Sequence, residues 1–306
     1  MFACTGCVAS PQAPLRPLVQ FSVGAGDGSV RVRDADSLTV ATYNVHGLQN
    51  RAGVQRDLAA LDDVLVWCLQ EVPYADDREI KSILPPGAWH VAVIPVNRDA
   101  RRGEWEAQVI ASRFPLKRVD VWPLDDRGPK RRVALAAEID VGGHHILVVN
   151  TDHEPSMLTW RDRNTLQAQR LAERVRTCGD KIVIVVGDFN CAGNLVRLRG
   201  NTVSVRLIDH TLAGGGLAPL PMTGSTFRCG LLRSRLDRIY ARGVRPVTGA
   251  VAANSRGSNH FPVWGRFTFP DSAVASRRTS LANDALHPVS SGHAEGDAGP
   301  TVSSGD

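Results

Sequence analysis

The feature that most constrains this chain is a set of apolar runs that end in polar side chains. Residues 182–186 (IVIVV) lead directly into residues 187–190 (GDFN). A short continuous apolar run of this kind predicts a strand buried on both faces. Asp188 and Asn190 are two residues apart, so their side chains share one face of an extended chain. Such a pair either binds a hard cation and a phosphate oxygen or closes an Asx turn.

The same pattern recurs along the chain. Polar side chains stand at the end of, within or just before other apolar runs: Asn44, Gln70 with Glu71, Asn150 with Asp152 and His153, Asp237, and Asn259 with His260. A buried carboxylate is costly unless it is paired, and we expect a histidine to pair with Asp237. Each segment alone is a weak signal, but together they predict one converging polar site at the strand ends.

The order of the elements predicts the fold class. Runs with strand character alternate with a few amphipathic stretches that have helical spacing. We expect helices at 54–64, 76–84 and 159–177, and strands at 38–45, 64–72, 89–96, 107–112, 118–122, 132–140, 144–150, 181–190, 235–242 and 261–269. Many strands with few long helices favour an α+β fold, namely a four-layer α/β/β/α sandwich with two mixed sheets packed face to face.

The composition divides the chain into three parts. Residues 1–36 mix Pro, Gly, Ser and charged residues, and we expect an N-terminal extension that is partly ordered or forms a hairpin over residues 20–34. Residues 37–270 are the predicted catalytic body. Residues 271–306 are rich in small and polar residues, and they predict a disordered tail because they cannot bury enough apolar surface.

Charge and hydropathy limit the partners and the location. The chain has 306 residues and a net charge of +5, with a pI of about 9.1, which suits an anionic partner. No run approaches the roughly 20 apolar residues that span a bilayer, and the first residues do not have the pattern of a signal peptide. We expect a monomeric cytoplasmic protein, or a secreted or lipid-anchored one if translation begins further upstream. The six cysteines require no disulfide framework.

Several motifs are specific when taken together and in order: 43–47 (YNVHG), 69–72 (LQEV), 112–116 (SRFPL), 185–190 (VVGDFN), 233–240 (RSRLDRIY) and 258–260 (SNH). This series resembles the endonuclease/exonuclease/phosphatase superfamily, which includes deoxyribonuclease I, AP endonucleases, sphingomyelinases and inositol polyphosphate 5-phosphatases. The resemblance covers about residues 38–269. It implies a divalent-metal-dependent phosphoesterase on the two-sheet sandwich.

The resemblance implies a metal site. Glu71 corresponds to the principal ligand, with Asn44 beside it and Asn259 as a further ligand, and the implied ion is Mg²⁺ or Mn²⁺. The family usually has Asp where this chain has Asn259. This change removes a negative charge, so we expect weaker binding of a second cation and a slightly lower pKa of His260.

The resemblance also implies catalytic roles. His260 corresponds to the catalytic histidine, and Asp237 fixes its tautomer. Asp188 corresponds to the residue that orients or deprotonates the attacking water, and Asn190 to the one that contacts phosphate and metal. His153 corresponds to a second histidine that contacts the phosphate or the leaving group.

The implied substrate-binding residues are Asn150 and the pair Arg131 and Arg132. The two arginines belong to the basic run 129–133 (PKRRV). That run is either a solvated turn or a segment that follows a phosphate backbone. Glu106 is a candidate partner of the second histidine, by its distance from the SRFPL turn.

One departure concerns the central strand. The family usually has Asn-Thr-His where this chain has Asn-Thr-Asp-His at residues 150–153. Either His153 is displaced by one residue, or Asp152 occupies the expected place. A shift of one residue turns a side chain to the other face of the sheet unless a bulge absorbs it.

These observations predict a magnesium-dependent phosphodiesterase that is most consistent with a nuclease acting on DNA or RNA. Within the enzyme class, the alternative substrate is a phospholipid or inositol phosphate head group. A different class is a catalytically weakened binding module on the same fold. The irregular residues 150–153 and the missing carboxylate at Asn259 motivate that last alternative.

Overall fold

A computed structural model describes residues 17–24, 37–98, 103–125, 130–155, 161–191 and 201–270. The chain divides into a unit of residues 1–269 and a unit of residues 270–306, and the fold below is that of the first unit. Strand β1, Val19–Val23, falls in the segment predicted as a hairpin, whose second half lies outside the described residues. The tail predicted for residues 271–306 also lies outside them.

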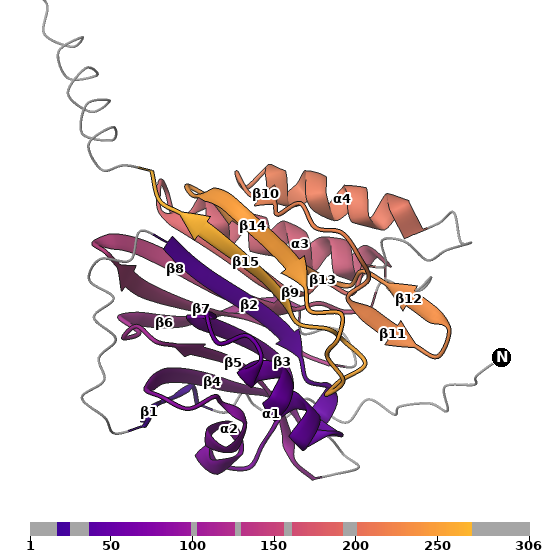
Figure 1. Cartoon of the computed structure of the whole chain (residues 1–306). Helices are drawn as coiled ribbons and strands as arrows, with labels where there is room; N and C mark the ends of the chain where they lie inside the picture. Colours follow the sequence, from indigo (N-terminus) through magenta and orange to yellow (C-terminus); the bar gives the residue numbers. More distant parts are fainter. Residues whose placement is uncertain are drawn as a thin grey trace, which may run out of the picture. The chain divides into compact units, whose positions relative to one another are not determined.

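The described strands form two large mixed sheets (Figure 1). Sheet A has the order β1-β4-β5-β3-β2-β15-β14, and sheet B has the order β10-β13-β9-β8-β7-β6. Sheet A contains, besides β1, the strands β2 Ser37–Asn44, β3 Val66–Tyr74, β4 Trp89–Arg98, β5 Trp105–Ser112, β14 Arg245–Val251 and β15 Val263–Thr268. Sheet B contains β6 Arg118–Asp125, β7 Arg132–Val141, β8 His144–Asp152, β9 Ile182–Asp188, β10 Ala218–Pro219 and β13 Asp237–Arg242.

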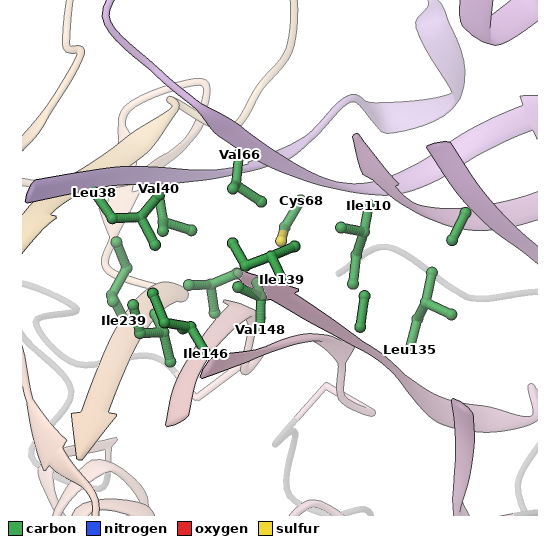
Figure 2. Packing of buried hydrophobic residues seen from close by; sticks show 14 of the residues in the cluster. Leu38, Val40, Val66, Cys68, Ile110, Leu135, Ile139, Ile146, Val148 and Ile239 are labelled. Atoms are coloured by element: carbon green, nitrogen blue, oxygen red, sulfur yellow. The ribbon is translucent and has the colours of Figure 1, made fainter. Parts of the chain in front are cut away.

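The two sheets pack face to face over an apolar core. Because side chains alternate along a strand, every second residue of β2 points inward. Leu38 and Val40 lie in this inter-sheet core, whereas Tyr43 belongs to the outer face of sheet A. Figure 2 shows the side chains of sheet A opposite Ile139, Val148 and the other labelled residues of sheet B. This alternation fixes which polar residues at the strand ends can face one another.

Helices cover the outer face of each sheet. On sheet A lie α1 Arg51–Ala59 and α2 Asp77–Ile83, whose buried Leu58 and Ile80 pack in one cluster with Trp67. On sheet B lie α3 Arg161–Arg176 and α4 Asn201–Ala213, where Leu171 and Leu212 pack with the outer residues of β9. The predicted four-layer sandwich is thereby confirmed. Among the helices that the structure describes, none has the length and apolar character needed to cross a bilayer.

Two parallel strand pairs bring polar residues to the same edge. In sheet A, β2 runs parallel to β3, and Asn44 lies opposite Gln70 in the last pair of the register. In sheet B, β8 runs parallel to β9, and Asp152 lies opposite Asp188. The antiparallel strand β13 begins at this edge, where Asp237 is also paired with Asp188. The carboxyl ends of four buried strands therefore meet, as the sequence predicted.

Several elements were not predicted from the sequence. Helix α4 contains Thr202, Val203 and Val205, and β-branched residues of this kind have low helix propensity. Strand β14 is mostly exposed or half-buried, so it lacks a clear apolar run. The hairpin of β11 Phe227–Cys229 and β12 Leu232–Ser234 has strands of three residues, which are too short to show a period.

Candidate active site

Asn44 joins the two sheets at the center of the site. Its side-chain Nδ2 donates to Glu71 Oε1 and to Asp188 Oδ2, each at 3.1 Å. Its Oδ1 accepts a hydrogen bond from the backbone N–H of His46 at 2.9 Å. In this orientation the buried amide holds two carboxylates in place and turns its nitrogen, not its oxygen, toward them. Asn44 thus positions the predicted metal ligand Glu71 by hydrogen bonding.

Glu71 has an unusual backbone conformation. The register of β3 with β5 shifts between Leu69 and Val72, and Glu71 has a φ of +54° within this bulge. Asn190 has a φ of +49° at the end of β9. Positive φ is unfavourable for a residue with a side chain, and bulges re-aim side chains at functional sites. The bulge explains how Glu71 reaches the site from a strand whose preceding residues are core.

The environment of Glu71 favours its ionised form. Burial alone would raise its pKa, but the His46 side chain and the positive charge of Lys130 lower it to about 2. The Nδ1 atom of His46 lies 3.7 Å from Glu71 Oε2. Glu71 is therefore a carboxylate at neutral pH, as a cation ligand must be.

His260 and Asp237 form a buried pair. The Nδ1 atom of His260 lies 3.1 Å and 2.9 Å from the two carboxylate oxygens of Asp237. Thr226 Oγ1 accepts the backbone N–H of Asp237 at 3.0 Å, which fixes the start of β13. Burial alone would lower the pKa of His260, but the charges of Asp237 and Asp188 raise it to about 9. The ring is therefore an imidazolium at neutral pH.

Asp188 lies between this pair and Asn44. Its Oδ2 atom is 3.8 Å from His260 Nε2, and its Oδ1 accepts the backbone N–H of Asn190 at 2.8 Å. Burial and the charge of Asp237 raise the pKa of Asp188 to about 7, against the lowering effect of His260. A carboxylate with a pKa near neutrality is suited to exchange a proton with water.

Gly187 allows Asp188 to reach its position. It has a φ of +149°, and a Cβ atom there would lie only 1.9 Å from the backbone oxygen of Thr151. The backbones of β8 and β9 approach one another so closely at this pair that only glycine fits. This is the physical reason for the glycine that precedes the aspartate.

A second group of acidic residues lies beside Glu71. Carboxylate oxygens of Glu71, Glu106 and Asp152 all lie within 4.8 Å of one another. Burial and the neighbouring carboxylates raise the pKa of Asp152 well above its usual range, despite the charge of Arg132. Oxygen ligands of this kind are those that Mg²⁺ and Mn²⁺ prefer. A bound divalent cation would relieve the repulsion, so these residues fit the implied metal.

The geometry of the strand ends agrees with a family-level match. Residues 41–260 match the model of the Endonuclease/Exonuclease/phosphatase family. The chain belongs to this family. The predicted fold and the motif series of residues 43–260 are thereby confirmed at the level of the family. No curated protein matches the chain.

Solved structures of this family share the fold. The endonuclease/exonuclease/phosphatase family protein from Leptotrichia buccalis has a TM-score of 0.62 at 16% identity, over 76% of this chain and 100% of its own. A family protein from Bacteroides thetaiotaomicron has a TM-score of 0.59 at 18% identity, over 76% and 98%. Truncated Caenorhabditis elegans TDP2 has a TM-score of 0.55 at 18% identity, over 76% and 97%. Identities this low show the fold alone.

Asp152, rather than His153, lies in the carboxylate group at the site. Arg132 donates to Asp152 Oδ2 at 2.6 Å and to Glu154 Oε2 at 2.9 Å. Arg132 is 6% exposed, and its guanidinium is already paired with these carboxylates. The phosphate contact predicted for Arg132 therefore does not fit its position. Its backbone neighbour Arg131 is held through its N–H and C=O by the side chain of Asn97.

His153 points away from the site. Its ring packs against Phe189, with centroids 4.8 Å apart, on the outer side of sheet B. It is fully buried, and neither ring nitrogen has a hydrogen-bond partner among the described residues. Burial, together with the Arg132 charge, lowers its pKa to about 3. The catalytic role predicted for His153 does not fit this position, because successive side chains of a strand face opposite ways.

Asn150 is also placed differently from the prediction. It is fully buried, and its Nδ2 donates to the backbone oxygens of Leu69 and Val109. Its Oδ1 accepts from Gln70 Nε2 at 2.6 Å. The whole amide is used to link β8 of sheet B to β3 and β5 of sheet A. Asn150 therefore joins the sheets beneath the site and cannot contact substrate.

The remaining predicted residues, Asn190 and Asn259, are held by hydrogen bonds to neighbouring residues. Asn190 Nδ2 donates to the backbone oxygen of His153 at 2.8 Å and lies 3.5 Å from Asp152 Oδ1. Asn259 Oδ1 accepts from Ser258 Oγ at 3.3 Å. The grouped carboxylates are thus a different ligand set from the predicted one, with Glu71 common to both.

Lys130 is a site residue that the sequence did not single out. Its Nζ donates to Glu106 Oε2 at 2.6 Å, and the charges of Glu106 and Glu71 raise its pKa against the effect of burial. It lines a hollow of about 170 Å³ together with Glu71 and Trp105. The run PKRRV indicated a concentration of positive charge, but only the fold shows that the charge of Lys130 is paired with carboxylates.

Proposed function

We propose that this chain is a metal-dependent phosphodiesterase that hydrolyses nucleic acid. The observation that carries the proposal is the arrangement of the pair His260–Asp237. It lies 3.8 Å from Asp188, and Asn44 connects Asp188 to Glu71 of the acidic group. Phosphoryl transfer needs three components close together. They are a positively charged imidazolium, a carboxylate whose pKa is near neutrality and a group of residues that can bind a cation.

The residues that would hold the metal are Glu71, Glu106 and Asp152, and Mg²⁺ or Mn²⁺ fits their oxygen ligands. When bound, the cation supplies neutralisation of negative charge on the phosphate. Arg132 and Lys130 fix the directions of Asp152 and Glu106. Ligands that are already held by hydrogen bonds need little rearrangement on binding, since surrounding contacts orient them.

The protein's own residues account for activation of the attacking water and for hydrogen bonding to the phosphate. Asp188 accepts a proton from the attacking water as the new bond to phosphorus forms, because its pKa of about 7 matches that task. His260 is held through Nδ1 by Asp237, so its Nε2–H is available to donate a hydrogen bond to the phosphate oxygens. The leaving oxygen departs with the electrons of its bond to phosphorus and takes its proton from solvent.

The substrate class rests on charge. The net charge of +5 and the pI of about 9.1 favour a polyanion. The discriminating experiment is a plasmid-nicking assay with Mg²⁺, set beside assays with sphingomyelin and inositol phosphates. We expect nicking that EDTA abolishes. Turnover confined to sphingomyelin or inositol phosphates would replace nucleic acid as the substrate, and no turnover of any of them would favour a binding module.

Variants test the residue roles. Asp188→Asn and His260→Gln are expected to reduce nicking by about 10³-fold or more, as removal of central catalytic groups does. The control is His145→Gln, which changes an exposed histidine on β8 far along the strand from Asp152. Circular dichroism checks that each variant is folded. Near-parental rates in either site variant would refute the mechanism.

A further inference from the structure

The hairpin β11–β12 stands beside the catalytic histidine. Its first residue, Phe227, is bridged to His260 in the backbone, and the two rings are in edge contact with centroids 4.9 Å apart. The backbone N–H of Arg228 donates to Asn259 O at 2.8 Å. Figure 1 shows the hairpin extending away from both sheets at the right of the view. Its base is therefore fixed to the site, while its tip projects outward.

The tip of the hairpin presents two exposed leucines. Gly230 and Leu231 form a two-residue turn, and Gly230 has a φ of +57°, which favours glycine. Leu231 is 102% exposed and Leu232 is 57% exposed. Burial would stabilise both side chains, so an exposed pair forgoes that stabilisation. Two adjacent exposed leucines at a projecting turn form a small apolar surface that a partner can contact.

A pair of arginines lies between the leucines and the site. Arg228 and Arg233 are directly opposite each other in the hairpin register, and both are exposed. Like charges at directly opposed positions destabilise a strand pair. The Arg228 guanidinium also lies 5.6 Å from the centroid of Phe261, next to the catalytic histidine. An anion bound beside the site would be attracted to both guanidinium groups and would offset the repulsion between them.

We propose that residues 227–234 form a nucleic-acid-gripping hairpin, in which Arg228 and Arg233 contact phosphates and the Leu231–Leu232 tip presses against bases in a groove. The inference rests on the proposed function for its substrate class. The hairpin extends about 10 Å from Phe227 to its turn, at about 3.3 Å per residue. Since phosphates of one strand are about 3.4 Å apart along the duplex axis, that length spans several nucleotides flanking the cleaved bond.

The same residues suit a membrane less well. A single myristoyl chain gives only marginal membrane binding, and two leucine side chains offer fewer carbon atoms than that chain. On nucleic acid, by contrast, phosphate contacts supply most of the affinity, and one or two leucines suffice as a wedge. The arginine pair and the short apolar tip together therefore favour a nucleic acid.

The test is binding of a fluorescein-labelled 20-base-pair DNA duplex by the full chain, measured by anisotropy in EDTA at several salt concentrations. Leu231→Ser/Leu232→Ser is expected to weaken binding by about 10-fold or more with the salt slope unchanged. Arg228→Gln/Arg233→Gln is expected to weaken binding and to reduce the slope of log K against log salt by up to about 1.8. Matched controls are Val247→Ser and Arg245→Gln, which change an exposed apolar and an exposed basic residue of β14.

Parental affinity in the leucine variant would refute the contact of the leucines with bases. An unchanged salt slope in the arginine variant would refute the contacts of the arginines with phosphates. A parent that ignores the duplex but sediments with phosphatidylcholine–phosphatidylserine vesicles, and loses this with the leucine change, would identify a membrane contact instead. Because EDTA prevents metal-dependent hydrolysis, the binding result stands apart from the nicking assay. A chain that grips DNA through the hairpin without cleaving it would refute the proposed function and leave this inference intact.

Discussion

Replacing His153 by leucine should remove an acid-sensitive position from the core. His153 is fully buried against Phe189, and its ring nitrogens have no hydrogen-bond partner among the described residues. Leucine has a similar volume and no group to protonate. We therefore expect His153→Leu to leave the stability at pH 7.5 unchanged or increased, because it removes an unsatisfied polar group that costs about 1–3 kcal/mol.

The pH dependence gives the magnitude. The pKa of His153 is about 3 in the folded protein, and about 6.5 is usual for an unfolded chain. Below pH 6.5 the unfolded state therefore binds a proton that the folded state excludes, so stability falls as the pH falls toward 3. At pH 5 this difference amounts to about 2 kcal/mol, and at pH 7.5 it is close to zero.

The assay is urea unfolding at pH 7.5 and pH 5 in EDTA, for the parent and the variant. The free energy of unfolding of His153→Leu, relative to the parent, should increase by about 2 kcal/mol between the two pH values. Phe189→Leu is the packing control, since it should destabilise by a similar amount at both. An equal difference between parent and His153→Leu at the two pH values would show that the buried histidine does not titrate as the structure requires.

Three further outcomes follow from the site. Asp237→Asn should lower turnover by about 10³- to 10⁴-fold. It should also move the alkaline limb of the pH–rate profile to lower pH, because the charge that raises the pKa of His260 to about 9 is lost. An unchanged alkaline limb would show that Asp237 does not control the protonation of His260. Asp57→Asn should lower the free energy of unfolding in urea by about 1.5–3 kcal/mol, since Asp57 accepts the backbone N–H groups of residues 256–257 in the loop before His260. An unchanged unfolding midpoint would show that these hydrogen bonds do not stabilise the loop. Gly187→Ala should lower the Tm strongly, because its Cβ would lie 1.9 Å from a backbone oxygen, and a Tm within 2–4 °C of the parent, about 1 kcal/mol, would show that β8 and β9 can separate there.

The apolar periodicity of the sequence was sufficient to predict the sheets and most helices. Runs such as 182–186 indicate strands buried on both faces, and the many strands with few long helices favoured two packed sheets. The hairpin of β7 and β8, with Gly142 and Gly143 between the strands, was predicted in the same way and is confirmed. Helix α4 was missed because it depends on the packing of Val205, Ile208 and Leu212 against the outer face of sheet B, which no local pattern displays.

The sequence by itself determined which kinds of residue stand at the strand ends, because each apolar run stops at a polar group. It left open whether Asp152 or His153 faces the site. The register with β9 decided this, since Asp152 is paired with Asp188 and the next side chain must point to the opposite face. Likewise, only the tertiary structure brought Glu106 and Lys130 beside Glu71, because they come from segments that no spacing rule connects.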